Sequence, residues 1–109
     1  MSNTGYRETL EGDMADYACG RGPSPFVLLR APIIENWSTE VRPLGKAFKL
    51  VVRGQVWGHP DEDIGDGDQF VSAALIWFDR KHRWCRTTQR VYRLGEHAGD
   101  EIPVDGIDA

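Results

Sequence analysis

The sequence predicts an α+β fold, with one or two N-terminal helices packed on a four-stranded antiparallel β-meander that can curl into a half-barrel. Apolar residues recur at helical spacing near the N-terminus, the period changes to two after Trp37, and turn residues separate the later runs. The length of 109 residues suits a single domain. We therefore expect one domain over 1–109, made of a helical part (4–31), a β-meander (36–95) and a loose acidic tail (96–109).

Two helices are expected before the strands. The first covers residues 4–18 and has an apolar face made of Tyr6, Leu10, Met14 and Tyr17. Gly20 is suited to the position that follows this helix. In the second helix Ser24 is the expected N-cap, Pro25 occupies the first helical position, and Pro32 ends the segment.

Four strands are expected next. The first is short and begins near Trp37, and the second, Phe48–Val56, alternates in polarity with a bulge at Gly54. The third, Phe70–Phe78, is apolar on both faces, which is typical of a central strand. The fourth runs over Trp84–Leu94. The predicted core contains Phe48, Leu50, Val52, Leu75, Ile76 and Trp77.

Charge is unevenly distributed along the chain. The net charge is −4 and the pI is about 5.3, which speaks against a simple nucleic-acid-binding domain. The acids gather in what we call the acidic loop, residues 61–68, whose members are Asp61, Glu62, Asp63, Asp66 and Asp68. The bases gather between residues 80 and 93.

The acidic loop admits three interpretations. A calcium site needs clustered oxygen ligands, but the EF-hand order fails, because Gly65 is at position five and Ser72 is at position twelve. Alternatively, the loop presents a negative surface that docks on the basic groove of a nucleic-acid-binding protein. The third interpretation is a solvated loop that only keeps the protein soluble. We expect no dedicated metal site and no cofactor.

The last predicted strand offers a second candidate surface. A regular strand places Trp84, Arg86, Arg90 and Tyr92 on one face. These residue types stack on bases and bind phosphates, and they are also enriched at protein–protein hot spots. Pairing of the arginines with acids on neighbouring strands is the purely structural alternative. We therefore take these four residues, together with the five acids of the loop, as candidate partner-binding residues.

Little in the sequence predicts catalysis. Cys19 and Cys85 are isolated and are expected to be free thiols. Arg86 beside Cys85 could lower the pKa of that thiol. The three histidines are scattered, and of these His59 lies beside the acidic loop, where it could serve as a base or ligand. The common nucleotide-binding and hydrolase motifs are absent from the sequence, so we predict that the protein is not an enzyme.

Several short motifs carry a resemblance. They are Ala31-Pro32, Trp37, Gly58-His59-Pro60, Trp84, Arg86-Thr87, Arg90 and Tyr92-Arg93-Leu94-Gly95. Over about residues 24–95 the chain resembles a family of small uncharacterised bacterial and prophage-associated proteins. The resemblance carries over no catalytic residue. It implies a mobile-element context, in which compact acidic proteins often inhibit host defence, anti-CRISPR proteins among them.

The leading hypothesis is a non-enzymatic, protein-binding inhibitor of the anti-CRISPR kind in the host cytoplasm. Its expected partner is a protein complex with a basic nucleic-acid-binding groove, such as a CRISPR effector. We expect neither direct nucleic-acid binding nor a membrane partner, and a small homo-oligomer stays open. The alternatives are an RNA- or DNA-binding module that uses strand 84–94 and a small enzyme around His59.

Overall fold

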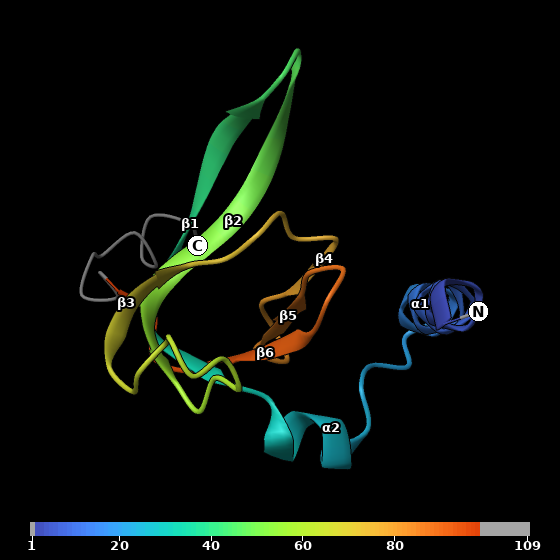
Figure 1. Cartoon of the computed structure of the whole chain (residues 1–109), viewed down its shortest axis with the longest axis horizontal. Coiled ribbons are helices and arrows are strands. Elements are labelled where there is room, and N and C mark those ends of the chain that lie inside the picture. Colours follow the sequence, from blue (N-terminus) through green and yellow to red (C-terminus); the bar gives the residue numbers. More distant parts are fainter. Residues whose placement is uncertain (1, 99–109) are drawn as a thin grey trace. The chain divides into compact units, whose positions relative to one another are not determined.

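The computed structural model describes residues 2–98, with side chains from residue 10 onward, and shows two helices followed by a six-stranded sheet (Figure 1). The elements are α1 (Ser2–Ala18), α2 (Pro25–Arg30), β1 (Ile33–Leu44), β2 (Ala47–Trp57), β3 (Asp68–Val71), β4 (Trp77–Asp79), β5 (Trp84–Arg86) and β6 (Val91–Leu94). The α+β class is confirmed. The chain divides into two compact units between Arg30 and Ala31. From residue 99 onward, the predicted tail lies outside the described residues.

The end of α1 and the start of α2 are formed by the residues that the sequence predicts, although α1 begins at Ser2 and not at residue 4. Gly20 follows α1 with a φ of 89°, and its N–H donates to Tyr17 O at 2.9 Å while Arg21 N–H donates to Asp16 O at 2.8 Å. This is a Schellman motif, which satisfies the last carbonyl groups of the helix. At the start of α2, Ser24 Oγ accepts the Val27 N–H at 3.2 Å. Within residues 2–98, no helix is long and apolar enough to cross a bilayer.

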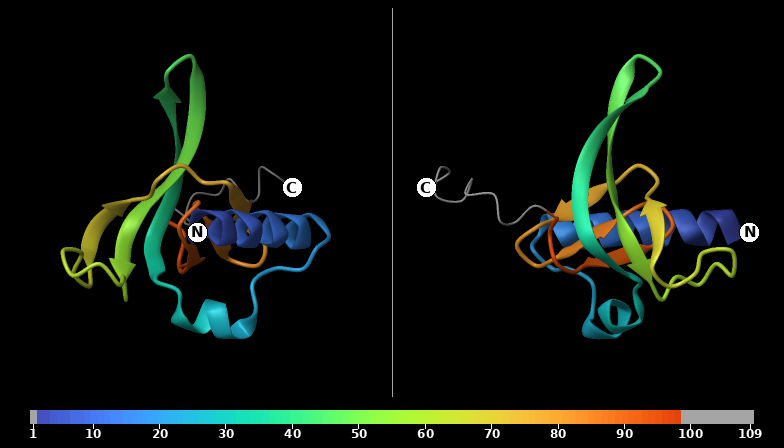
Figure 2. Two further views of the ribbon diagram at one scale, coloured as in Figure 1. Left: turned by 45° about the vertical axis from the view of Figure 1, so that its right-hand side comes forward. Right: turned by 90° about the vertical axis from the view of Figure 1, so that its left-hand side faces the viewer.

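Strands β1 and β2 form a long antiparallel hairpin. The prediction of a short first strand beginning near Trp37 is wrong, because β1 has 12 residues and begins at Ile33. Leu44 pairs with Ala47 across a two-residue turn, Gly45-Lys46, in which Gly45 has a φ of 61°. A glycine with positive φ at the first turn position suits the type II′ turn that tight hairpins favour. Figure 2 shows that this hairpin extends well past the other strands of the sheet.

The bulge in this hairpin lies opposite the predicted position. The register shifts on β1 between Glu35 and Ser38, where Asn36 has a φ of 53°. Gly54 faces this bulge from β2. A Cβ atom on Gly54 would lie 2.6 Å from Glu35 O and 2.8 Å from Ile34 Cγ2. Glycine is therefore needed at position 54 because the bulged strand approaches so closely.

The structure does not confirm the predicted four-stranded antiparallel meander. The sheet has the order β3-β2-β1-β6-β5-β4, in which the β1–β6 pair is parallel, and it is not closed into a barrel. The single central strand predicted over 70–78 is wrong, because this segment forms both edge strands. Its middle, residues 72–76, connects the edges: Ser72 N–H donates to Val52 O and Ile76 N–H donates to Arg86 O, each at 2.8 Å.

The single strand predicted over 84–94 is also wrong. It is a hairpin of β5 and β6, in which Cys85 pairs with Tyr92. Thr87 makes the turn, because its Oγ1 accepts the N–H groups of Gln89 at 3.2 Å and Arg90 at 3.3 Å. A threonine side chain that bonds the following backbone replaces the glycine or proline that usually marks a turn.

The core lies within the second unit and consists of Ile34, Trp37, Val52, Val56, Cys85, Tyr92 and Leu94. Of the predicted core residues, Val52 is fully buried and Leu75 packs against the cluster from a half-buried position. Leu50, Ile76 and Trp77 are half-buried. Phe48 is 74% exposed, so its placement in the core was wrong. It lies near the tip of the β1–β2 hairpin, beyond the reach of the neighbouring strands.

Candidate functional site

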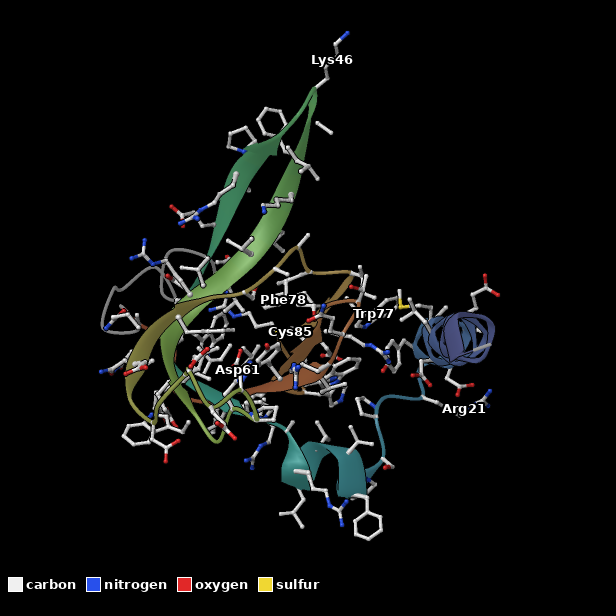
Figure 3. The ribbon with its side chains drawn as sticks, viewed as in Figure 1. Arg21, Lys46, Asp61, Trp77, Phe78 and Cys85 are labelled. Carbon is white, nitrogen blue, oxygen red and sulfur yellow. The ribbon has the colours of Figure 1, made fainter. Side chains whose placement is uncertain are left out.

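The acidic loop connects β2 to β3 and exposes all five of its acidic side chains. Three of the aspartates accept a backbone N–H from nearby: Asp61 from Asp63 (2.9 Å), Asp66 from Gly58 (2.8 Å) and Asp68 from Gly65 (2.8 Å). Aspartate side chains commonly fix turns in this way. Glu62 and Asp63 are not used as acceptors in this pattern. The hydrogen bonds within the loop therefore fix its backbone, while its carboxylates are exposed to solvent. Asp61 is labelled in Figure 3.

Among the described side chains, no lysine or arginine forms an ion pair with a carboxylate of the acidic loop. From Gly54 to Asp79 the sequence contains no lysine or arginine. Across residues 10–98, the ion pairs with Lys or Arg involve other acids, namely Asp16, Glu40 and Glu96. Within the same residues, no group of three or more His, Cys, Asp or Glu side chains is arranged to hold a metal ion. The loop is a concentrated patch of negative charge.

His59 joins the acidic loop to the core of the second unit. Its Nδ1 accepts the N–H of Asp61 at 3.0 Å, and its Nε2 lies 3.1 Å from Tyr92 Oη. A nitrogen that accepts from a backbone N–H carries no proton, so the neutral ring holds its proton on Nε2 and donates it to Tyr92. Both ring nitrogens are thus engaged within the protein. The arrangement makes His59 an anchor for the loop rather than an exposed base.

Aromatic and charged neighbours complete this anchor. The ring of Phe70 lies 5.5 Å from the rings of both His59 and Tyr92. Burial and then the positive charge of Arg90 lower the pKa of His59, although Asp61 acts in the opposite direction. Burial raises the pKa of Tyr92. At neutral pH the anchor is therefore a pair of uncharged, hydrogen-bonded side chains.

This anchor predicts a dependence of stability on pH. The folded protein binds a proton at His59 less tightly than the unfolded chain, so the stabilisation is complete above pH 6.5 and is lost as the pH falls through the lowered pKa. We expect the free energy of unfolding, measured in urea from pH 7 to pH 5, to fall more steeply for the wild type than for His59→Gln. Parallel slopes for the two proteins would contradict the role of His59 as a neutral anchor.

The second candidate surface is largely inside the protein. Trp84 is 3%, Arg86 7% and Tyr92 4% exposed, whereas Arg90 is half-buried. The Arg86 side chain turns back on its own strand end, where Nε donates to Thr87 O at 3.2 Å. The exposed aromatic–arginine face that a regular strand would give is not formed by β5 and β6, because the chain reverses between them. A role for these four residues in partner binding stays a prediction.

The two cysteines lie in different surroundings. Cys19 is exposed and Cys85 is buried, and both are free thiols. Cys85 lies on β5 beside Phe78, its partner on β4 (Figure 3). Burial raises the pKa of the Cys85 thiol to about 12, which is opposite to the lowering expected from its neighbour Arg86.

Sequence patterns did not reveal two features of the site. The contact between His59 and Tyr92 joins residues 33 positions apart, with no local signal for either partner. The exposed apolar end of the β1–β2 hairpin, with Val41 and Phe48, was also missed, because alternation alone does not show where a strand leaves the core.

Comparison with known proteins identifies a family. No curated protein and no solved structure matches the chain. A family of unknown function, DUF6634, matches residues 11–104, which include α2, every strand, the acidic loop and the residues of the His59 anchor. Because this match spans most of the sequence, the chain belongs to the DUF6634 family.

Proposed function

We propose that the protein is a non-enzymatic inhibitor that binds another protein through its acidic loop. One observation carries the proposal: five exposed carboxylates, none paired with a lysine or arginine in the described part of the chain, lie on a loop that fixes its own backbone. Such a surface is complementary to a basic groove. The interaction needs no reacting group, and both nitrogens of the nearest histidine are already engaged.

The mode of binding follows from the chemistry of carboxylates. Their oxygens accept charge-assisted hydrogen bonds from arginine and lysine, as phosphate oxygens do. A loop that is ordered before binding loses less conformational freedom on association. Clustered negative charge also speeds encounter with a basic surface at low salt. The acidic loop would therefore compete with nucleic acid for the same basic side chains.

The most concrete partner is the nucleic-acid-binding groove of a host defence complex. In that version the protein acts in the host cytoplasm as an anti-CRISPR-like inhibitor from a phage or mobile element, and the target is a CRISPR effector. The net charge of −4 supports this choice, because a polyanion would be repelled while a basic protein would be attracted.

The loop can be tested without disturbing its internal hydrogen bonds. Glu62→Gln with Asp63→Asn removes two charges and none of the three aspartate–backbone bonds. We expect partner capture from a bacterial lysate, quantified by mass spectrometry, to fall about tenfold at low salt, and the salt dependence to flatten. The thermal stability should be unchanged.

A matched control removes the same charge elsewhere. Glu11 and Asp16 lie on α1. The double variant Glu11→Gln with Asp16→Asn removes the exposed ion pair between Asp16 and Arg21, and such a pair contributes little to stability. Capture should match the wild type in this control. If both double variants capture equally well, or if the captured proteins have no affinity for nucleic acid, the acidic loop is not a phosphate mimic.

A further inference from the structure

Among the strands that the structure describes, none pairs with the outer edge of β1 over most of its length. Strand β6 pairs with β1 only at Ile33 and Ile34. Further along, Trp37 N–H donates to Glu96 O at 3.1 Å and Trp37 O accepts the Ala98 N–H at 2.8 Å. Beyond Trp37, no strand among residues 2–98 pairs with this side of β1. Such an edge is a template for pairing with another chain.

The register of the hairpin shows which backbone groups this edge offers. On β2, Leu50 O accepts the Leu75 N–H and Val52 O accepts the Ser72 N–H, so Leu50 and Val52 direct their backbone groups away from β1. Their partners on β1 are Val41 and Thr39. In an antiparallel pair such partners both point outward. Val41 and Thr39 therefore present N–H and C=O groups at the open edge.

Pro43 also directs its backbone toward the open edge, because it lies two residues beyond Val41 and pairs with Phe48 on β2. It presents a carbonyl group but has no N–H to donate. Val41 and Phe48, which are 64% and 74% exposed, lie with Pro43 on one apolar face of the hairpin. Glu40 and Arg42 lie on the opposite face.

We propose that the occupant of this edge is a second copy of the same chain, paired antiparallel about a two-fold axis at Val41. Val41 then exchanges two backbone hydrogen bonds with the partner's Val41. Thr39 N–H donates to the C=O of the partner's Pro43, and the reciprocal bond forms across the axis. The two exposed valine side chains lie side by side as a cross-strand pair.

Charge selects this register over its neighbours. Within one chain Arg42 donates to Glu40 at 2.9 Å. With Val41 on the axis, Glu40 also lies opposite the partner's Arg42, and Arg42 opposite the partner's Glu40. A shift by one pairing step in one direction places Glu40 opposite the partner's Glu40. The same shift in the other direction places Arg42 opposite the partner's Arg42. The sequence of the edge is thus complementary to itself in one register, which is the property that an isologous dimer requires.

Sedimentation velocity of the full chain over a range of concentrations tests the proposal. We expect reversible dimers in the wild type and a dissociation constant about tenfold higher in Val41→Pro, which removes an outward N–H that the hairpin does not use. Far-UV circular dichroism confirms that this variant is folded. A wild type that stays monomeric throughout, or dimers that Val41→Pro leaves unchanged, would overturn the proposal.

Charge reversal gives an independent readout. Arg42→Glu alone and Glu40→Arg alone should each weaken the dimer about tenfold, while the double variant with both changes should recover it to within about threefold. Failure of this rescue would overturn the register. A wild type that stays monomeric while the variant Ile102→Ser with Val104→Ser dimerises would show that the C-terminal segment occupies the edge, and would equally overturn the proposal.

Discussion

Replacing Ile34 with alanine is expected to lower the free energy of unfolding by about 2–5 kcal/mol. Ile34 is fully buried on β1 and belongs to the core of the second unit. The substitution removes apolar contacts and leaves a cavity that the sheet can only partly close. Urea unfolding followed by tryptophan fluorescence measures the change, because Trp37 is a neighbour in the same cluster.

The matched control is Phe48→Ala in the same hairpin. Phe48 is a larger side chain but lies largely in solvent, so its removal should cost less than about 1 kcal/mol. A loss at Phe48 as large as that at Ile34 would mean that the end of the hairpin is covered in solution and that the core extends along it.

The second large effect is expected at Gly54. Alanine here places a Cβ atom against Glu35 O and the Ile34 side chain, and because the carbonyl belongs to the bulged backbone, the strand itself must shift. Overpacking of this kind costs about 1–3 kcal/mol. The measurement is the same urea titration, and the bulge should also show altered amide chemical shifts around Asn36.

Gly12 is the control for Gly54, because the expected effect of alanine there has the opposite sign. It lies within α1, and a Cβ atom there meets nothing within 4 Å. Gly12→Ala should therefore stabilise the helix by up to about 1 kcal/mol. Equal effects at Gly12 and Gly54 would contradict the close approach of β1 and β2 at the bulge.

Local patterns predicted the elements that local chemistry determines. The end of α1 depends on Gly20, and the start of α2 depends on Ser24 and Pro25; the preferences of these residues act within one turn of chain. The second strand, and the presence of a bulge near Gly54, followed from alternation and from a glycine inside a strand. In each case the determining residues lie within a few positions of one another.

The errors occurred where distant segments decide the structure. The run 70–78 contains no glycine or proline, so nothing local shows that residues 72–76 cross from one edge of the sheet to the other. Phe70, Trp77 and Phe78 are half-buried and Val71 is exposed on the two edge strands, and together they produce the same apolar pattern as a central strand. The turn after Arg86 was missed because Thr87 makes it with its side chain.

In the candidate site, too, the locally determined feature was predictable and the features that depend on distant segments were not. Exposure of the acidic loop was predictable, because like charges beside glycines are costly to bury. The contact between His59 and Tyr92 was not predictable, because it depends on the positions of β2 and β6 in the sheet. The burial of Trp84 and Arg86 likewise depends on a chain reversal that their spacing does not reveal.

Photocrosslinking in cells that carry the protein tests most directly whether the acidic loop meets the partner. Pro60 is exposed beside the loop, and replacing it with a photoreactive phenylalanine keeps all five acids; Phe26, exposed on α2, is the control position. We expect Pro60 to crosslink to a nucleic-acid-binding protein, and Glu62→Gln with Asp63→Asn to lower the yield of this product about tenfold. A partner that crosslinks from Phe26 but not from Pro60 would contradict docking through the acidic loop.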